Sequence, residues 1–488
     1  MKKIVSLLLI LVLSITLASC KEKTEIETEE PYENYLEIYY LNDFHGALTP
    51  DDDQLGISYI ANLINTKKEA NPENVLFIVG GDMLQGSALS NYYAGESTIE
   101  LLNLSNLDAF TIGNHEFDWG LETVANYKDG NEENGEANFP FLGANVFYKG
   151  TTDIPDFIDP YTIIEKGDHK IGIIGTIGYG LEYSIAQSRI DDYEFGSPLD
   201  AIEEYSYYLR TEEDCDMIIV VAHDGGSSLN SQVTALEGDY KVDAVFNGHT
   251  HSTYARLTSG TPVVQSGDNG EFVGYVRWDF EETGTIVEFD NLDYFSDALL
   301  STPDPAVEAL LQSYILETSD LLDTEIMVSG DYYSSGDLSV WLAELVREAT
   351  NSDVGLQNGG GTRNSIDDGQ SITLSTLYQI WPFDNVIKTV MLPGSVVKNL
   401  VGDYYSSTDI SVFDNNTLYK VAVNDYSFDK TNSAFQNGED ITNTGIVLRD
   451  LVQDELELQT VLYTNFFTTN SILTIYSTYQ TEEETTNP

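Results

Sequence analysis

The chain has 488 residues, more than one ordinary domain accommodates, so at least two domains are expected. Its hydrophobic content of 41% is sufficient for folded cores and excludes a largely disordered protein. It contains 22 basic and 81 acidic residues, and the formal net charge of -59 excludes nonspecific binding to nucleic-acid polymers or anionic membranes as its main activity. An anionic substrate would need a local positive charge, and bound cations are the simplest source.

The N-terminus has the pattern of a processing signal. A positively charged start precedes apolar residues 4–18, a segment that is short for a membrane span. A Leu-Ala-Ser-Cys sequence that ends at Cys20 resembles a bacterial lipoprotein cleavage box. The resemblance implies a signal peptide over residues 1–19, a lipid anchor on Cys20 and an extracytoplasmic, membrane-anchored protein. An ordinary secretory signal is the alternative. Residues 20–34 are polar and are expected to be a tether.

Short segments rich in apolar and β-branched residues predict strands of buried sheets. They are residues 36–41, 75–79, 109–112, 171–175, 217–222 and 242–246. Residues 57–68 have helical spacing, and strands alternate with helical patterns through this part of the chain. The alternation predicts an α/β layered domain, which we place at residues 35–297.

Polar residues with metal-binding chemistry directly follow all of these strands except residues 171–175. In chain order they are Asp43 and His45, Asp82, Asn114, His115 and Asp118, His223, and His249 and His251. Because ligands of open α/β sheets gather beyond the carboxyl ends of strands, these side chains are expected to converge. In extended backbone, Asp43 and His45 would lie on one side of the chain. Oxygen and imidazole donors without a thiolate favour Zn, Mn, Fe or Co.

His115 and Asp118 have complementary chemistry. The imidazole can carry a proton near neutral pH, and a carboxylate three residues later can fix its tautomer and stabilise its cation. Gly113 is expected to let the backbone turn sharply before them. A polar turn with a surface histidine is the alternative for this motif alone. That alternative weakens because the chain has 6 histidines and all but His169 follow a predicted strand.

Five motifs together resemble the dinuclear metallophosphoesterase pattern. They are Asp43-x-His45, Gly81-Asp82, Gly113-Asn114-His115-Glu116, His223 and Gly248-His249-x-His251. From about residue 35 onward the chain resembles the secreted 5′-nucleotidase family, which also contains UDP-sugar hydrolases and cyclic-nucleotide phosphodiesterases. The resemblance implies a four-layer αββα metal domain followed by an α+β substrate-binding domain.

The resemblance also implies roles for these residues. Asp43, His45 and His251 would hold one divalent metal ion, and Asn114, His223 and His249 would hold a second. Asp82 would bridge the two ions, and His115, oriented by Asp118, would face the phosphate. The implied reaction converts a nucleoside 5′-monophosphate to a nucleoside and phosphate through a hydroxide that bridges the metals.

The C-terminal part begins with a linking helix. A Pro-rich break precedes helical spacing over residues 306–322, so we place the link at 298–322 and a substrate-binding domain at 323–478, before a polar tail at 479–488. The resemblance implies a substrate-binding loop and two rings that stack on a nucleobase. Asn358, Gly360 and Arg363 belong to the loop, and the rings are Phe383 and Tyr426.

Two departures from the family pattern concern the substrate. Residues 427–432 replace the glycine-rich motif that usually follows the second ring, and residues 330–337 lack the arginine usually found before the first helix of this domain. Arg363 is left without an obvious companion. A UDP-sugar diphosphohydrolase or a 2′,3′-cyclic-nucleotide phosphodiesterase on the same metal site is therefore an alternative. A non-catalytic surface binding protein is a further alternative, against which stands a competent residue at every metal and catalytic position.

Overall fold

The computed structural model describes residues 34–51, 53–131, 135–280, 285–430, 432–462 and 466–467. The predicted signal peptide, Cys20, most of the tether and the polar tail lie outside these residues. The described residues from Tyr35 onward belong to one compact unit. Within the described ranges, no helix combines the length and apolar character needed to cross a membrane.

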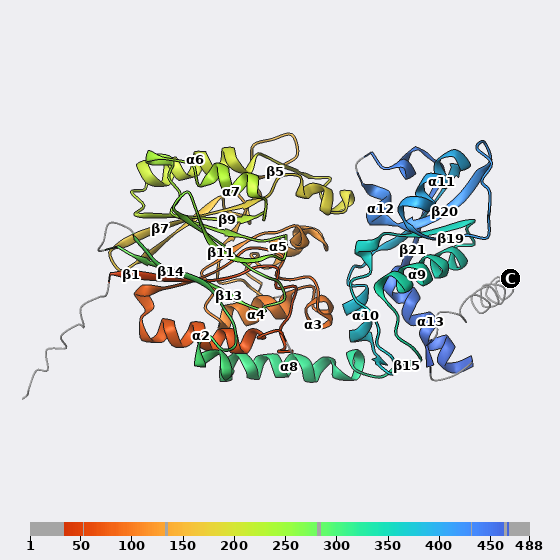
Figure 1. Ribbon diagram of the computed structural model, residues 1–488, viewed down its shortest axis with the longest axis horizontal. Helices are drawn as coiled ribbons and strands as arrows, with labels where there is room; N and C mark the ends of the chain where they lie inside the picture. Colours follow the sequence, from red (N-terminus) through yellow and green to blue (C-terminus); the bar gives the residue numbers. More distant parts are fainter. Residues whose placement is uncertain are drawn as a thin grey trace, which may run out of the picture. The chain divides into compact units, whose positions relative to one another are not determined.

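Two six-stranded sheets form the centre of the N-terminal part (Figure 1). The first has the order β14-β13-β1-β2-β3-β4, and β1 to β4 run parallel. Its strands are β1 (Tyr35–Leu41), β2 (Val75–Val79), β3 (Ala109–Thr111), β4 (Phe141–Leu142), β13 (Val273–Asp279) and β14 (Thr285–Leu292). The short, fully buried β2 fits a strand covered on both faces of its sheet.

The second sheet has the order β11-β12-β10-β9-β7-β6, with parallel pairing from β7 through β9 and β10 to β12. Its strands are β6 (Tyr161–Lys166), β7 (His169–Ile177), β9 (Met217–His223), β10 (Ala244–Asn247), β11 (Thr253–Thr258) and β12 (Thr261–Ser266). All six predicted strands are present in these two sheets, with ends shifted by at most two residues.

Successive side chains of a strand point to opposite faces of its sheet and therefore belong to different hydrophobic cores. In β1, Ile38 and Tyr40 lie in the core between the two sheets, whereas Tyr39 and Leu41 lie in a core on the other face of their sheet. Helices cover both outer faces (Figure 1). They are α2 (Ile57–Ala70) and α4 (Glu96–Leu104) on the first sheet, and α6 (Pro198–Thr211) and α7 (Ser227–Val233) on the second. The predicted four-layer αββα architecture is confirmed.

The predicted linking helix is α8 (Pro305–Leu322). It starts where Asp304 caps the N–H groups of Ala306 and Val307, with Pro305 in its first turn. It packs on α2, α4 and α3 (Ala88–Tyr92), and also on α10 (Leu374–Ile380) of the C-terminal part. The helix therefore contacts elements on both sides of it in the sequence.

The C-terminal part mixes strands and helices, as predicted. A five-stranded sheet has the order β19-β16-β20-β18-β21, and a three-stranded sheet has the order β17-β15-β22. The strands are β15 (Met327–Ser329), β16 (Val354–Gln357), β17 (Ser371–Ile372), β18 (Val386–Pro393), β19 (Tyr405–Ser407), β20 (Leu418–Asn424), β21 (Glu439–Val447) and β22 (Phe466–Phe467). The longer helices are α9 (Ser335–Ala349), α11 (Gly394–Asp403) and α13 (Leu448–Leu462), and α12 (Asp425–Asp429) is a single short turn.

Candidate active site

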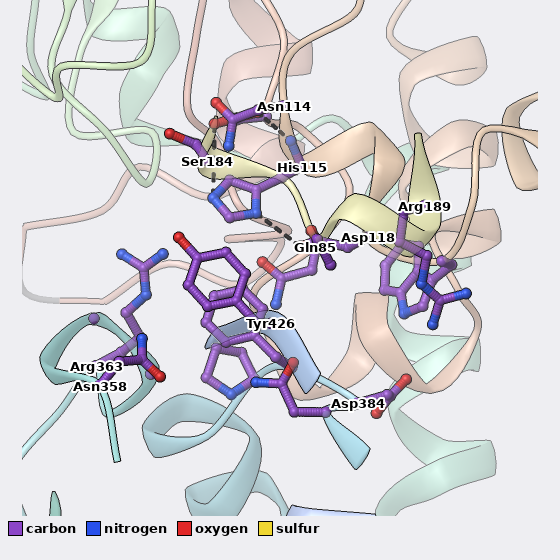
Figure 2. Close-up of a pocket in the computed structure, with 18 of the residues that line it drawn as sticks. Gln85, Asn114, His115, Asp118, Ser184, Arg189, Asn358, Arg363, Asp384 and Tyr426 are labelled. Atoms are coloured by element: carbon purple, nitrogen blue, oxygen red, sulfur yellow. Dashed lines mark hydrogen bonds and ion pairs between the residues drawn. The ribbon is translucent and has the colours of Figure 1, made fainter. Parts of the chain in front are cut away.

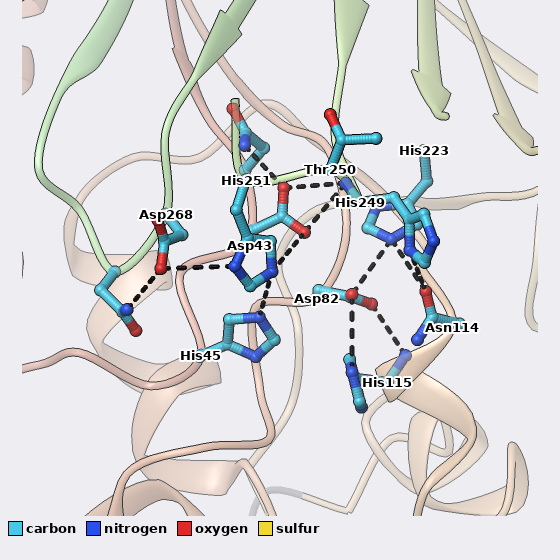
Figure 3. Close-up of polar contacts among 12 residues, drawn as sticks. Asp43, His45, Asp82, Asn114, His115, His223, His249, Thr250, His251 and Asp268 are labelled. Carbon is cyan, nitrogen blue, oxygen red and sulfur yellow. Dashed lines mark hydrogen bonds and ion pairs between the residues drawn. The ribbon is translucent and has the colours of Figure 1, made fainter. Parts of the chain in front are cut away.

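Loops from both N-terminal sheets bring the predicted metal ligands together (Figure 3). Two groups of three side chains have ligand atoms within 4.8 Å of one another in each group. The first group is Asp43, His45 and His251, and the second is Asp82, His223 and His249. They come from the loops after β1, β2 and β10 and from the end of β9, so residues far apart in the sequence meet at one edge of the two sheets.

The first group contains two imidazoles that face each other. His45 Nε2 lies 3.3 Å from His251 Nε2, and His251 Nε2 lies 3.7 Å from Asp43 Oδ1. Asp43 is fully buried, and Asn42 donates a hydrogen bond of 2.7 Å to its carboxylate. These are the residues that the family resemblance assigned to one metal ion.

Asn114 joins the second group. Its Oδ1 atom lies 3.2 Å from His223 Nε2 and 2.9 Å from His249 Nδ1. Asp82 Oδ2 lies 3.1 Å from His223 Nε2. The three residues predicted for the second metal ion are therefore adjacent to Asp82, while the bridging role of Asp82 stays a prediction.

Backbone conformation at this site is unusual. Asp43, His45, Asp82, His249 and His251 have φ angles of 47°, 49°, 54°, 71° and 52°. The left-handed region costs energy for residues with a side chain and persists where the surroundings fix it, commonly at functional sites. The prediction that Asp43 and His45 share a side through extended backbone is wrong, because a tight turn brings them together.

In several of the predicted metal-binding histidines, a polar contact at Nδ1 fixes the orientation of the ring. His45 Nδ1 lies 2.9 Å from the Gln85 carbonyl, and His223 Nδ1 lies 2.7 Å from the Gly80 carbonyl. A carbonyl oxygen only accepts, so both Nδ1 atoms carry a proton and both Nε2 atoms face the cluster. His251 Nδ1 similarly lies 3.4 Å from Asp268 Oδ2. No sequence motif marked Asp268.

The donor set fits divalent cations. Burial lowers the pKa of His45 to about 3 and that of His249 to about 4, so both rings are neutral and able to donate a lone pair. Burial also raises the pKa of Asp43 to about 6. The Nε2 atoms of His45 and His251 lie 3.3 Å apart, a separation that calls for a proton or a cation between them. A metal ion would therefore displace protons from this buried group.

His115 and Asp118 form the predicted pair. His115 Nδ1 lies 2.7 Å from Asp118 Oδ2, which leaves Nε2 available to a substrate. Burial alone would lower the pKa of His115, but Asp118 and Asp82 raise it to about 9. The ring is therefore an imidazolium near neutral pH. The His115 backbone N–H also donates to Asp82 Oδ1 at 2.8 Å, which couples this pair to the second ligand group.

Gly113 and Glu116 hold the loops in place. A Cβ atom on Gly113 would collide with Asp82 Oδ1, so glycine is required for close approach. The φ angle of Gly113 is not positive, so the turn after β3 does not depend on the left-handed region at this residue. The buried Glu116 carboxylate accepts N–H bonds from Gly113, Asp82 and Met83 at 2.6, 2.9 and 2.9 Å. This positioning role was missed, although Glu116 lies inside the motif.

A cavity of about 230 Å³ joins the metal-binding edge to the C-terminal part (Figure 2). All five predicted substrate residues line it together with His115, Asp118 and several ligands. They are Asn358, Gly360, Arg363, Phe383 and Tyr426. Asp43, His45 and His223 do not line it.

The C-terminal residues of the cavity contact one another and their neighbours. The Arg363 guanidinium lies 5.2 Å from the centre of the Phe383 ring. Asn358 Oδ1 accepts a hydrogen bond of 2.7 Å from Asn424 Nδ2. Tyr426 lies in the first turn of α12, which Asn424 caps through its side chain.

The cavity also contains residues that the sequence did not indicate. Gln85, Trp119, Ser184 and Arg189 line its N-terminal wall. Ser184 and Arg189 lie in the segment after β7, the strand whose end was predicted to carry no ligand. No motif marks this segment, so only the fold reveals that it reaches the site.

Comparisons with known proteins agree with this architecture. Residues 36–253 match the calcineurin-like phosphoesterase family, and residues 315–413 match the 5′-nucleotidase C-terminal domain. Endonuclease YhcR of Bacillus subtilis (strain 168) is 26% identical over 400 residues, which are 75% of this chain but only 32% of that relative. The chain thus spans about a third of the length of YhcR.

A relative of similar length and a solved structure complete the comparison. Snake venom 5′-nucleotidase of Naja atra is 26% identical over 74% of this chain and 76% of its own length. The crystal structure of a 5′-nucleotidase precursor from Thermus thermophilus has a TM-score of 0.72 at 21% identity and covers 87% of this chain and 96% of its own. The chain belongs to the calcineurin-like metallophosphoesterases that carry a 5′-nucleotidase C-terminal domain.

Proposed function

We propose that the chain hydrolyses the phosphate ester of extracellular nucleotides, releasing a nucleoside and inorganic phosphate from a nucleoside 5′-monophosphate. One observation carries the proposal. The His115–Asp118 pair, members of both ligand groups and the aromatic residues Phe383 and Tyr426 line the same cavity. A reacting phosphate and a nucleobase therefore have complementary groups within one site.

The ligand residues would hold two divalent ions, one on each group. When bound, such ions supply positive charge to the phosphate and lower the pKa of a water molecule. Zn, Mn, Fe or Co suits imidazole and carboxylate donors. Asp82 is the candidate to contact both ions, because its carboxylate lies at the second group and its backbone carbonyl accepts the N–H of His45 at 3.0 Å.

His115 acts on the substrate and not on a metal in this proposal. Asp118 occupies Nδ1 and holds the ring as an imidazolium. The Nε2–H group would donate to a phosphate oxygen and stabilise the charge that develops there and on the leaving oxygen. Positioned proton donors of this kind contribute typically about 10²–10⁴-fold to rate.

The nucleobase would stack on Phe383 and Tyr426, with Arg363, Asn358 and the Gly360 backbone beside the nucleotide. Stacking tolerates the identity of the base, so the site is expected to accept several nucleotides. The extracytoplasmic location and the lipid anchor on Cys20 belong to the same proposal and suit a substrate outside the cell.

Substrate profiling tests this function. The purified full chain, kept in detergent, is assayed with AMP, UDP-glucose and 2′,3′-cyclic AMP at saturating divalent metal. Preferential release of phosphate from AMP supports the proposal. Preference for UDP-glucose or the cyclic nucleotide would replace it with the corresponding alternative, and hydrolysis of none of the three would remove the nucleotide assignment.

A further inference from the structure

Arg189 stands apart from the other arginines of the described residues. Each of the others contacts a carboxylate or an aromatic ring. They are Arg210 with Asp243, Arg256 with Tyr254, Arg277 with Glu37, Arg347 with Glu348, Arg363 with Phe383 and Arg449 with Asp384. The Arg189 guanidinium has no such partner within the described part of the chain, although 81 acidic residues face only 22 basic ones. An unpaired cation on a cavity wall points to a ligand from outside the chain.

The segment that carries Arg189 is anchored. Ile185 and Ile190 are buried at 2% and 4% exposure, while Ala186 and Arg189 between them line the cavity. The Arg189 N–H donates to the Ala186 carbonyl at 2.8 Å, which closes a turn. The 3₁₀ turn η5 (Gln187–Arg189) also contacts α12, the helix of Tyr426. The backbone of Arg189 is therefore held at the wall from both sides.

The carboxylates of the cavity do not cancel this charge. Three of them are paired with other cations and the fourth accepts a backbone N–H. Asp82 pairs with His223, Asp118 with His115 and Asp384 with Arg449, and Asp425 accepts from Tyr426. Arg189 and Arg363 are thus cationic groups of the cavity that form no ion pair with these carboxylates.

The two arginines lie on different sides of the catalytic pair. Figure 2 shows Arg363 on one side of His115 and Arg189 beyond Asp118 on the other. A phosphate at His115 and an anion at Arg189 are therefore separate groups. A guanidinium presents a planar fork of donors that matches phosphate oxygens in pairs.

We propose that Arg189 binds a second phosphate group of the substrate, one that is not hydrolysed while it occupies this position. The inference rests on the proposed function and narrows its substrate class to nucleotides with two phosphate groups. The second phosphate can follow the first directly, as in a nucleoside diphosphate, or lie across the ribose, as in a nucleoside 3′,5′-bisphosphate. Arg189 would supply, from the metal domain, the companion cation that residues 330–337 of the C-terminal part lack.

Kinetics of Arg189→Gln test the assignment. AMP, ADP and adenosine 3′,5′-bisphosphate are compared in the full chain at saturating metal. KM for one of the doubly phosphorylated substrates is expected to rise about tenfold or more, because a charge-assisted pair is lost, while KM for AMP changes little. The substrate that responds identifies the position of the second phosphate. Arg189→Lys keeps the positive charge but not the planar pair of donors. Its KM for that substrate is expected to lie between the values of the wild type and Arg189→Gln.

Arg256→Gln is the matched control, since Arg256 is exposed and stacks on Tyr254 away from the cavity lining. Equal KM changes for all three substrates, or none, would overturn the inference. A fall in kcat that extends to p-nitrophenyl phosphate would also overturn it and would make Arg189 a positioning residue for Asp118.

Failure of the proposed function can be told apart from failure of the Arg189 assignment. If the wild-type chain hydrolyses p-nitrophenyl phosphate but no nucleotide, the nucleotide function is wrong. Inhibition by pyrophosphate relative to phosphate, at fixed free metal, then tests Arg189 alone. The Arg189→Gln variant should lose the preference for pyrophosphate, and an unchanged preference would refute the second phosphate site.

Discussion

The imidazole of His115 lies nearly parallel to the ring of Phe383, with centroids 5.8 Å apart and planes inclined by 19°. His115 comes from the loop after β3, and Phe383 comes from the C-terminal part shortly after α10. Asn91 of α3 donates to the neighbouring Pro382 carbonyl at 3.0 Å, so a buried hydrogen bond supports this contact. The residue predicted to face the phosphate and one predicted to stack on the base are therefore neighbours.

Phe383→Ala is expected to weaken nucleotide binding without base selectivity. A stacked aromatic ring contributes about 1–3 kcal/mol per base, so KM for AMP, GMP and UMP should rise by similar factors of roughly 5- to 150-fold. Steady-state kinetics with the three nucleotides provide the measurement. KM for p-nitrophenyl phosphate, which has no base, should change much less.

Phe413→Ala is the matched control for this variant, because Phe413 packs against Tyr419 and does not line the cavity. An unchanged nucleotide KM in Phe383→Ala would show that the C-terminal stacking site is misassigned.

His115→Ala should lower kcat by about 10²–10⁴-fold while the metal content stays the same as in the wild type. The reason is geometric: Nδ1 is bonded to Asp118, and His115 belongs to neither ligand group. Kinetics and elemental metal analysis are carried out on the same preparation.

His169→Ala serves as the control for loss of a histidine, since His169 starts β7 and stacks on Phe280. Loss of one metal equivalent from His115→Ala would make His115 a ligand and would contradict its assignment to the phosphate.

The buried carboxyl group of Glu455 is expected to make the free energy of unfolding depend on pH. Its side chain is fully buried in α13, Gln459 donates to Oε1, and Oε2 has no partner among the described residues. Burial raises the pKa of Glu455 from 4.5 to about 7. The folded chain then binds more protons than the unfolded chain between these values, so the free energy of unfolding falls as pH rises from 4.5 to about 7.

Glu455→Gln removes this ionisation. Its Tm should exceed that of the wild type at pH 8 by several degrees, for an effect on the order of 3 kcal/mol, and should differ little at pH 5. Differential scanning calorimetry at fixed metal concentration measures both. The exposed Glu457→Gln should show no such pattern, and an equal Tm difference at both pH values would refute the buried-carboxylate explanation.

Local patterns predicted the metal domain well for a physical reason. A continuous apolar run such as residues 75–79 indicates a buried strand from its local composition alone. The predicted metal ligands directly follow such strands in the sequence. The left-handed turn at Asp43 and His45 was not predictable, because neither residue type requires it and only the surrounding loops fix it.

The rest of the site depends on contacts that local patterns do not encode. Asp268 reaches His251, and Arg189 reaches the cavity wall, through the topology of the fold, and neither lies in a recognisable motif. Gly113 was singled out for a turn, and the structure adds a second reason for a glycine here, the close approach of Asp82 Oδ1. The substrate residues from Asn358 to Tyr426 were placed by resemblance, and the structure brings them into one cavity with His115.

In the proposed function, hydrolysis requires two divalent ions, one on the Asp43 group and one on the Asp82 group. The direct test is to chelate and dialyse the full chain, add Mn²⁺ or Zn²⁺ stepwise, and follow bound metal and AMP hydrolysis together. Activity is expected to be absent at first and to return as about two ions bind per chain, as a two-metal mechanism requires. Asp82→Ala should bind metal more weakly and stay inactive throughout the titration. Full activity in the metal-free sample would contradict a requirement for bound metal.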